Sequence, residues 1–225
     1  MKKVLLATTL ALCVNSAFAA APTAVLKVKG ILTNAACTPE LSNGGVVDYG
    51  FIRLGGLSAT ADNQLGQKNI DLTINCTAAT KVSWNMVDDR ASSRAGIKVE
   101  NAMVGGTSQI APSQLYGVGK TSSDINIGNY AMFVNVGNVV ADGNTVDTLY
   151  QQGGGTAWTK STNGSSQGEN YRDFTVATAG SLEPLAFQTA TFPLVTSLAI
   201  KDTATLAITD DTPLDGQITI SLKYL

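Results

Sequence analysis

The residues most suited to chemistry form a short glycine–serine motif, and the sequence lacks the partner that this motif needs. Residues 164–168 (GSSQG) match the G-x-S-x-G nucleophile elbow, which requires a strand before it, a helix after it and a histidine within reach. The sequence contains no histidine. Ser-His-Asp catalysis, Cys-His catalysis and histidine-ligated zinc are therefore excluded. We predict a non-enzymatic protein with no catalytic residue, no metal site and no cofactor.

The charged residues are few and nearly balanced. Lys and Arg number 15 against 17 Asp and Glu, a net charge of −2, and charged residues make up 14% of the chain. Nucleic-acid binding requires clustered cations, so we predict no nucleic-acid partner. The acidic pairs at residues 88–89 and 210–211 do not have calcium-loop spacing, and such pairs are more often turn residues.

The N-terminus has the three parts of a secretory signal peptide. Two lysines are followed by the apolar run at residues 4–14 and by an Ala-x-Ala end at residues 17–19. We predict a signal peptide over residues 1–19, cut between Ala19 and Ala20, with cleavage after Ala20 or Ala21 as alternatives. No other segment approaches the roughly 20 apolar residues that span a bilayer. The protein is expected to be exported to the periplasm and not to be an integral membrane protein.

The cysteines predict one structural disulfide. Cys13 leaves with the signal peptide, so that Cys37 and Cys76 remain in an oxidising compartment, where two cysteines permit one pairing. The bond closes a loop of about 39 residues, for which the chain-entropy model gives roughly 4 kcal/mol of stabilisation.

Short strand patterns recur along the chain, separated by Gly, Asn and Asp, and no segment has a sustained period of 3.6. About ten strands favour a single all-β antiparallel sandwich over residues 29–225, with an inserted hairpin or loop region around 105–167. Trp84 is predicted to lie in the core, and residues 151–167 to form an exposed loop or hairpin end. The predicted strands include residues 46–50, 70–76, 81–87, 96–100, 130–136, 174–177, 185–192, 194–200, 205–208 and 217–225.

The last of these strands has the strongest period-2 pattern in the sequence. Its apolar positions alternate with Thr, Ser and Lys, so that one face is predicted to be buried. These apolar residues are Ile218, Ile220, Leu222 and Tyr224.

Four features resemble subunits of bacterial chaperone–usher fimbriae. They are residues 29–37 (KGILTNAAC), a second cysteine about 40 positions on, an alternating final strand, and an aromatic residue one place from the end. Residues 45–50 (GVVDYG), 87–90 (VDDR), 116–119 (YGVG) and 213–216 (PLDG) are similar to a fimbrial-like bacterial family known as domain of unknown function 1120, which has no established biochemical activity.

The resemblance implies an immunoglobulin-like, pilin-type sandwich that lacks its last strand. A periplasmic chaperone fills the resulting groove, and the N-terminal extension of the next subunit then replaces it as a donated strand. Ile218, Ile220, Leu222 and Tyr224 would face this groove. The donor would lie in residues 20–28, with Val25, Leu26 and Val28 as candidates. An outer-membrane usher and other pilus subunits are the further implied partners, and the route leads from periplasm to fimbrium and cell surface.

Two departures from the pilin pattern bear on the role. The extension ahead of Lys29 is short and contains Pro22, and the mature chain is longer than a typical major pilin. Both favour a minor or tip-associated subunit with a role in cell adhesion, in contact with a glycan or a surface receptor. The alternative is a soluble periplasmic or secreted binding module that is complete in its own strands, does not polymerise, and uses loops near Trp158 to contact a ligand.

Overall fold

The computed structural model describes residues 28 and 36–225 of the chain. Residues 36–225 lie within one compact unit. The predicted cleavage site at Ala19 and Ala20 and the donor candidates Val25 and Leu26 lie outside the described residues. Val28 is described, and its side chain is exposed.

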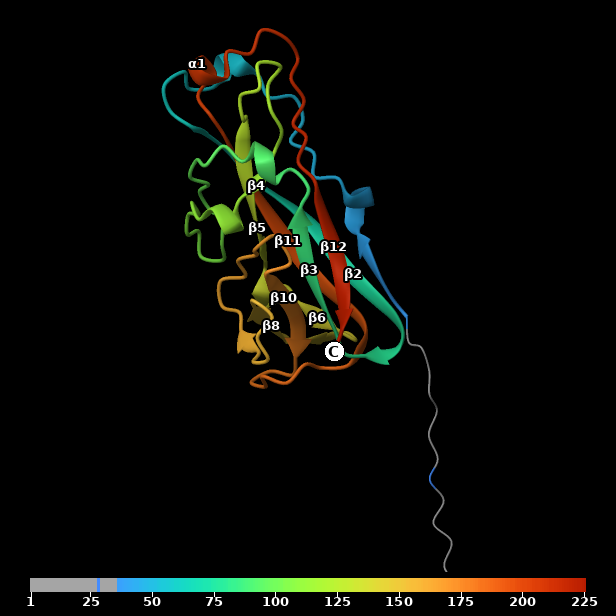
Figure 1. Cartoon of the computed structure of the whole chain (residues 1–225). Helices are drawn as coiled ribbons and strands as arrows, with labels where there is room; N and C mark the ends of the chain where they lie inside the picture. The colour runs from blue at the N-terminus through green and yellow to red at the C-terminus, as the bar shows by residue number, and fades with distance from the viewer. Residues whose placement is uncertain (1–27, 29–35) are drawn as a thin grey trace, which may run out of the picture. The chain divides into compact units, whose positions relative to one another are not determined.

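The described strands form two antiparallel sheets (Figure 1). In the first sheet the order is β1-β2-β11-β5-β4, and the hairpin β6-β7 is attached to β11. In the second sheet the order is β12-β3-β10-β8-β9. The first sheet comprises β1 (Cys37–Leu41), β2 (Asn63–Thr80), β4 (Tyr116–Gly117), β5 (Gly128–Val134), β6 (Val140–Ala141), β7 (Asn144–Thr145) and β11 (Phe187–Ile200). The second comprises β3 (Val82–Asp88), β8 (Asp147–Gln152), β9 (Thr159–Lys160), β10 (Arg172–Ala177) and β12 (Ile218–Tyr224).

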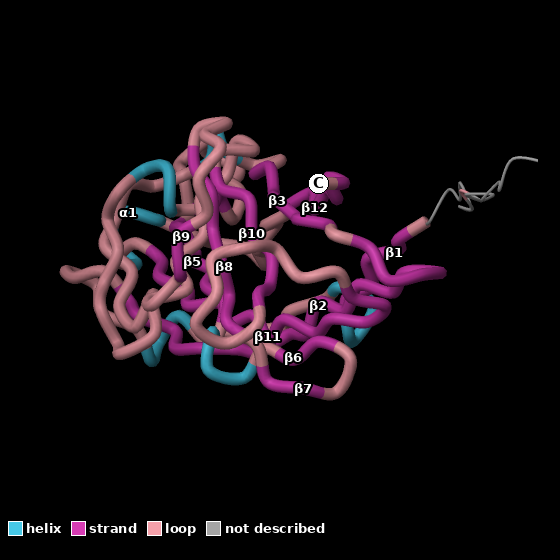
Figure 2. The backbone as a smooth tube through the Cα atoms, turned by 90° about the horizontal axis from the view of Figure 1, so that it is seen from below, coloured by secondary structure: helices cyan, strands magenta, loops and turns pink. Residues whose placement is uncertain are grey.

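The two sheets stack as the layers of a sandwich, which Figure 2 shows from below. The only α-helix within residues 36–225 is α1 (Thr203–Leu206), and the remaining helical segments are single 3-10 turns. These are η1 (Ser42–Gly45), η2 (Leu54–Gly56), η3 (Ala91–Ser93), η4 (Pro112–Gln114) and η5 (Val136–Asn138). The predicted all-β antiparallel sandwich and the Cys37–Cys76 disulfide are confirmed.

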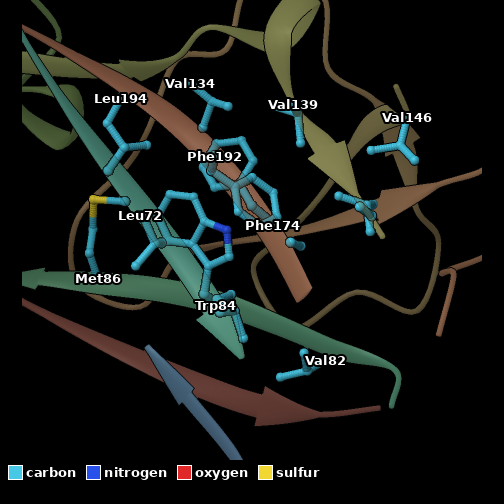
Figure 3. Close-up of a cluster of buried hydrophobic side chains, with 14 of the residues drawn as sticks. Leu72, Val82, Trp84, Met86, Val134, Val139, Val146, Phe174, Phe192 and Leu194 are labelled. Atoms are coloured by element: carbon cyan, nitrogen blue, oxygen red, sulfur yellow. The ribbon is translucent and has the colours of Figure 1, made fainter. Parts of the chain in front are cut away.

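The core between the layers is built around Trp84, as predicted (Figure 3). Its ring stacks on Phe174 with centroids 5.0 Å apart and meets the edge of Phe192 at 5.5 Å. All three side chains are fully buried. Alternation in β2 adds Leu72 and Ile74 from the facing sheet, because successive strand residues point to opposite faces. Aromatic contact across the two sheets therefore fixes the spacing of the sandwich.

Strand β11 is continuous where two strands were predicted on either side of Pro193. One edge of β11 stays paired with β2 through the proline, opposite Asp71. The other edge pairs with β6 at Ala190 and with β5 from Leu194 onward. Proline lacks an N–H group, and it occupies the point at which β11 changes neighbours on that edge.

Two further predictions of local structure are wrong, and a third holds only in part. Residues 205–208 do not form a strand, because the carboxylate of Asp202 accepts the N–H of Thr205 and caps α1 instead. Residues 96–100 contribute one isolated β-bridge at Val99. The exposed loop or hairpin end predicted over residues 151–167 is found only in part. Residues 153–157 are exposed as predicted, but Ser161 and residues 164–166 are buried, and Ser165 forms a β-bridge with Phe133 of β5.

The region around residues 105–167, where an inserted hairpin or loop region was predicted, contributes strands to both sheets. Strand β5 pairs with the central strand β11, and β8 pairs with β10.

Candidate functional site

A seam lies between β1, at one edge of the first sheet, and β12, at one edge of the second sheet. Strand β1 pairs with β2 alone and β12 pairs with β3 alone, so within residues 36–225 each has one edge without a strand partner. Both strands lie on the same side of the sandwich in Figure 2. Free strand edges present rows of N–H and C=O groups that can pair with another strand.

A groove of about 730 Å³ follows this seam. Its floor is formed by apolar residues of the first sheet, among them Ile70, Met132 and Leu194, which are buried. One wall is the chain from Leu41 to Leu54, and the other is the chain from Ile208 into β12. A strand that entered this groove would therefore meet apolar side chains on its inner face and unpaired backbone at its edge.

Strand β12 lines part of the groove with two of the four apolar residues that were expected to face one, and Tyr224 is exposed. Ile218 and Ile220 line the groove and are half-buried, while Leu222 is half-buried against the core but does not line the groove. The residues between them, Thr219 and Ser221, are exposed. Incomplete burial of the inward face of an edge strand leaves apolar surface that a further strand would cover.

Tyr224 closes one end of the seam. Its hydroxyl accepts the backbone N–H of Cys37 at 2.9 Å, which joins the last strand to the first. Next to it, Leu225 donates its N–H to the carbonyl of Lys81 at 3.1 Å. Cys37 is held in turn by its disulfide to Cys76 on β2. The predicted disulfide therefore anchors the wall of the groove at its closed end.

The wall after β1 is an extended segment that the sequence predicted to be a strand. Residues 46–50 are not paired with any strand of the described chain. Val47 and Tyr49 point inward and are half-buried, while Val46 and Asp48 are exposed. The alternation in the sequence correctly indicated which side chains of this segment point inward. It could not show whether another strand pairs with the segment, and in the structure the segment borders the groove.

Tyr49 attaches this wall to the first sheet. Its hydroxyl lies 3.2 Å from both the carbonyl oxygen and the Oγ1 of Thr196 on β11. Burial raises the pKa of Tyr49, and the hydrogen bond with Thr196 partly opposes that rise. The next turn is set by Gly50, which has φ +68° and donates its N–H to Asp48 at 2.7 Å. A residue with a Cβ would be strained at this φ.

The opposite wall is fixed by an ion pair that the sequence did not reveal. Asp215 accepts two hydrogen bonds from Arg90, at 2.8 and 3.1 Å, and its N–H donates to the carbonyl of Val118. The hydrogen bond from Arg90 lowers the pKa of Asp215. Residues 87–90 and 213–216 are both among the segments that resemble the family. In the sequence, only the opposite charges of Arg90 and Asp215, 125 positions apart, could have indicated that the two segments meet.

The G-x-S-x-G motif is used for packing. Ser166 lies 2.6 Å from the hydroxyl of the fully buried Tyr116, and Ser165 accepts a hydrogen bond from Arg172. Gly164 has φ +68°, and a Cβ there would lie 1.9 Å from the carbonyl oxygen of Val134. These contacts explain why small residues occupy the segment.

Other sequence-based candidates are placed as follows. Trp158 is half-buried, beside the strand pair β8-β9. Among the described residues, no three His, Cys, Asp or Glu side chains are grouped so that they could hold a metal ion. No helix in the described part of the chain is long and apolar enough to cross a membrane.

Comparison with known proteins identifies relatives over most of the chain. Residues 26–131 match the family described as "Protein of unknown function (DUF1120)". The chain is 30% identical over 222 residues to Protein GltF of Escherichia coli K12, covering 89% of this chain and 87% of that protein. It is 31% identical over 215 residues to Uncharacterized protein YhcF of the same organism, covering 89% and 90%. The chain therefore belongs to the DUF1120 family of proteins of unknown function.

Proposed function

We propose that this protein is a non-enzymatic, fimbrial-like subunit whose open seam receives a β-strand from another chain. The observation that supports this most directly is the pair of unpartnered strand edges, β1 and β12, on either side of an apolar groove. Addition of a strand to such an edge is a recurring mode of protein recognition, in which backbone hydrogen bonds supply affinity and alternate side chains supply specificity.

The physical case rests on how poorly the free edge is protected. Natural proteins shield edge strands with proline, with charged side chains such as Lys, with bulges or with inward-pointing charges. Strand β1 contains Pro39, and β12 contains Lys223, which pairs with Asp173. Between Ile218 and Leu222, β12 has no proline, bulge or charged residue, and its inward residues are apolar. Each guest side chain that becomes fully buried would contribute about 1.5–3 kcal/mol. A seam of this kind is stable in solution when a guest strand fills it.

The predicted signal peptide and the resemblance to chaperone–usher subunits support a pathway for this protein. A periplasmic chaperone would occupy the seam first, and a strand of another pilus subunit would replace it at the outer-membrane usher. The protein would then reside in a fimbrium at the cell surface, as a minor or tip-associated subunit that contributes to adhesion. Residues 20–28, with Val25, Leu26 and Val28, would be the strand that it donates.

A strand appended to the chain tests the seam directly. After Leu225 we would add an Asn-Gly turn, which favours a two-residue hairpin, and a seven-residue strand that alternates Val and Thr. The appended strand can pair with β12 on its free edge, and we expect the free energy of unfolding to rise by at least about 2 kcal/mol. A matched control carries the same extension with each Val replaced by Asn.

Equal stability of the two extended proteins would refute strand acceptance. If the unextended protein also unfolded cooperatively and reversibly, the soluble, self-complete binding module would be the better description. The pathway is tested separately by co-production with a fimbrial chaperone, where we expect a complex that resists denaturant. Failure to recover that complex, with a positive result for the extension, would reject the chaperone–usher pathway and retain the open seam.

A further inference from the structure

The charged side chains that line the groove all have the same sign. They are the carboxylates of Asp48 on one wall and of Asp210 and Asp211 on the other. No lysine or arginine is among the described residues that line it. The two walls continue beyond η1 and the start of β12 toward α1 (Figure 1), so the carboxylates lie at the end opposite to Tyr224.

These carboxylates have no cationic partners within residues 36–225. None of the three takes part in an ion pair, whereas Asp215 close by is bound to Arg90. Lys120 lines an adjoining pocket together with Asp210 and Asp211, but its ammonium group pairs with Asp124. Asp48 accepts the N–H of Gly50, and Asp210 accepts the hydroxyl of Thr209. Like charges on facing walls repel one another, and a cationic guest would relieve that repulsion.

We infer that the groove selects a lysine- or arginine-bearing strand, whose apolar side chains alternate inward while its cations meet Asp48, Asp210 and Asp211. This inference rests on the proposed strand-acceptor function and specifies the chemistry of the guest. The apolar floor favours any alternating strand, whereas the acidic end discriminates among such strands by charge. Electrostatic complementarity of this kind contributes more to specificity than to total affinity.

The chain's own sequence contains a segment of the required composition. In residues 22–32 (PTAVLKVKGIL), Leu26 and Val28 alternate with Lys27 and Lys29. In an extended strand the two apolar side chains would share one face and the two lysines the other. This segment is therefore a suitable probe for the acidic end of the groove.

The test measures how strongly charge affects peptide binding. The protein would be refolded from denaturant with a fluorescent peptide of residues 22–32, and affinities would be compared by competition in fluorescence anisotropy. Three unlabelled peptides compete: the native sequence, one with Lys27→Glu and Lys29→Glu, and one with Leu26→Asn and Val28→Asn. We expect the charge-reversed peptide to bind about threefold to tenfold more weakly, which corresponds to about 0.3–0.7 kcal/mol for each of two exposed ion pairs.

Variants of the protein test whether the acidic end causes this difference in affinity. In the protein with Asp210→Asn and Asp211→Asn, the gap, meaning the ratio of the affinities of the native and charge-reversed peptides, should fall below about threefold. The matched control changes two exposed carboxylates that do not line the groove, Glu100→Gln and Glu183→Gln, and should leave the gap unchanged. Salt at about 1 M, where the Debye length is about 3 Å, should abolish the gap in every protein.

The outcomes separate this inference from the proposed function. If the native and charge-reversed peptides bind equally at low salt, while the Asn-substituted peptide does not bind, charge selection is wrong and strand acceptance stands. An unchanged gap in the Asp210→Asn, Asp211→Asn protein also overturns charge selection by this end of the groove. If all three peptides fail to bind, or bind alike, both the inference and the strand-acceptor function are wrong.

Discussion

Loss of the Cys37–Cys76 disulfide offers a quantitative test of how the first wall of the seam is held. Strand β1 has five residues, and only its two ends, Cys37 and Leu41, are half-buried. Its attachments within the described chain are the pairing with β2, the disulfide and the hydrogen bond to Tyr224. Little apolar surface holds β1 in place, so the cross-link carries much of its stability.

The expected magnitude comes from the length of the closed loop. The two cysteines are 39 positions apart. The chain-entropy model then predicts that the Cys37→Ala, Cys76→Ala protein loses about 4 kcal/mol of unfolding free energy. For a domain of this size that corresponds to a fall in Tm of roughly 8–16 °C.

The assay is urea denaturation followed by Trp fluorescence, with and without reductant. Reductant should destabilise the wild-type protein to the level of the double alanine variant and should leave that variant unchanged. Hydrogen exchange adds a local measurement, because the amides of β1 should exchange faster while those of β3 and β10 keep their relative order of protection. A loss below about 1 kcal/mol, or equal acceleration in all three strands, would refute the reasoning.

Three other perturbations test the core, a buried glycine and the ion pair between Asp147 and Lys160. Trp84→Ala empties the centre of the sandwich and should cost about 3–5 kcal/mol in urea denaturation, and a loss below about 1 kcal/mol would contradict the assigned core. Gly164→Ala meets both a positive φ and a backbone oxygen at 1.9 Å, so it should destabilise by more than about 1 kcal/mol, whereas Gly137→Ala, which has open space, should be nearly neutral in the same assay. The pKa of Asp147 is held below 3.8, chiefly by the N–H of Gly180 and also by Lys160. Its contribution to stability is therefore complete above that pH and is lost as the pH falls through the lowered pKa. Asp147→Asn should be less stable than wild type at pH 6, the two should converge toward pH 2 in thermal melts, and a constant difference would refute the assignment.

Local patterns predicted the elements whose environment is set by their own residue types. The alternation in residues 70–76 and 217–225 identified β2 and β12, because a half-buried strand must alternate apolar and polar side chains. The cysteine count identified the disulfide, because one pairing was available. Trp84 was assigned to the core from its apolar neighbours at alternate positions.

Errors occurred where a distant segment determines the local structure. Residues 46–50 alternate in burial as a strand would, but they pair with no strand of the described chain, and pairing cannot be inferred from alternation. Residues 161–168 contain Gly, Ser and Asn, which are typical of exposed loops, yet Tyr116 and Arg172 bind the serines and bury them. The error at 205–208 has a local cause: Asp202 caps a helical turn over Thr203–Leu206, which ends at Ala207 in a left-handed conformation.

The sequence by itself determined the all-β class, the disulfide and the absence of imidazole chemistry, because each follows from composition or from short-range periodicity. Only the tertiary structure decided that β1 and β12 leave unpaired edges on either side of one seam, that Arg90 and Asp215 hold one wall, and that Asp48 shares a groove with Asp210 and Asp211. The physical reason is that strand pairing and charge proximity are relations between segments far apart in the chain. The order of strands in a sheet sets those relations, and no single segment encodes that order.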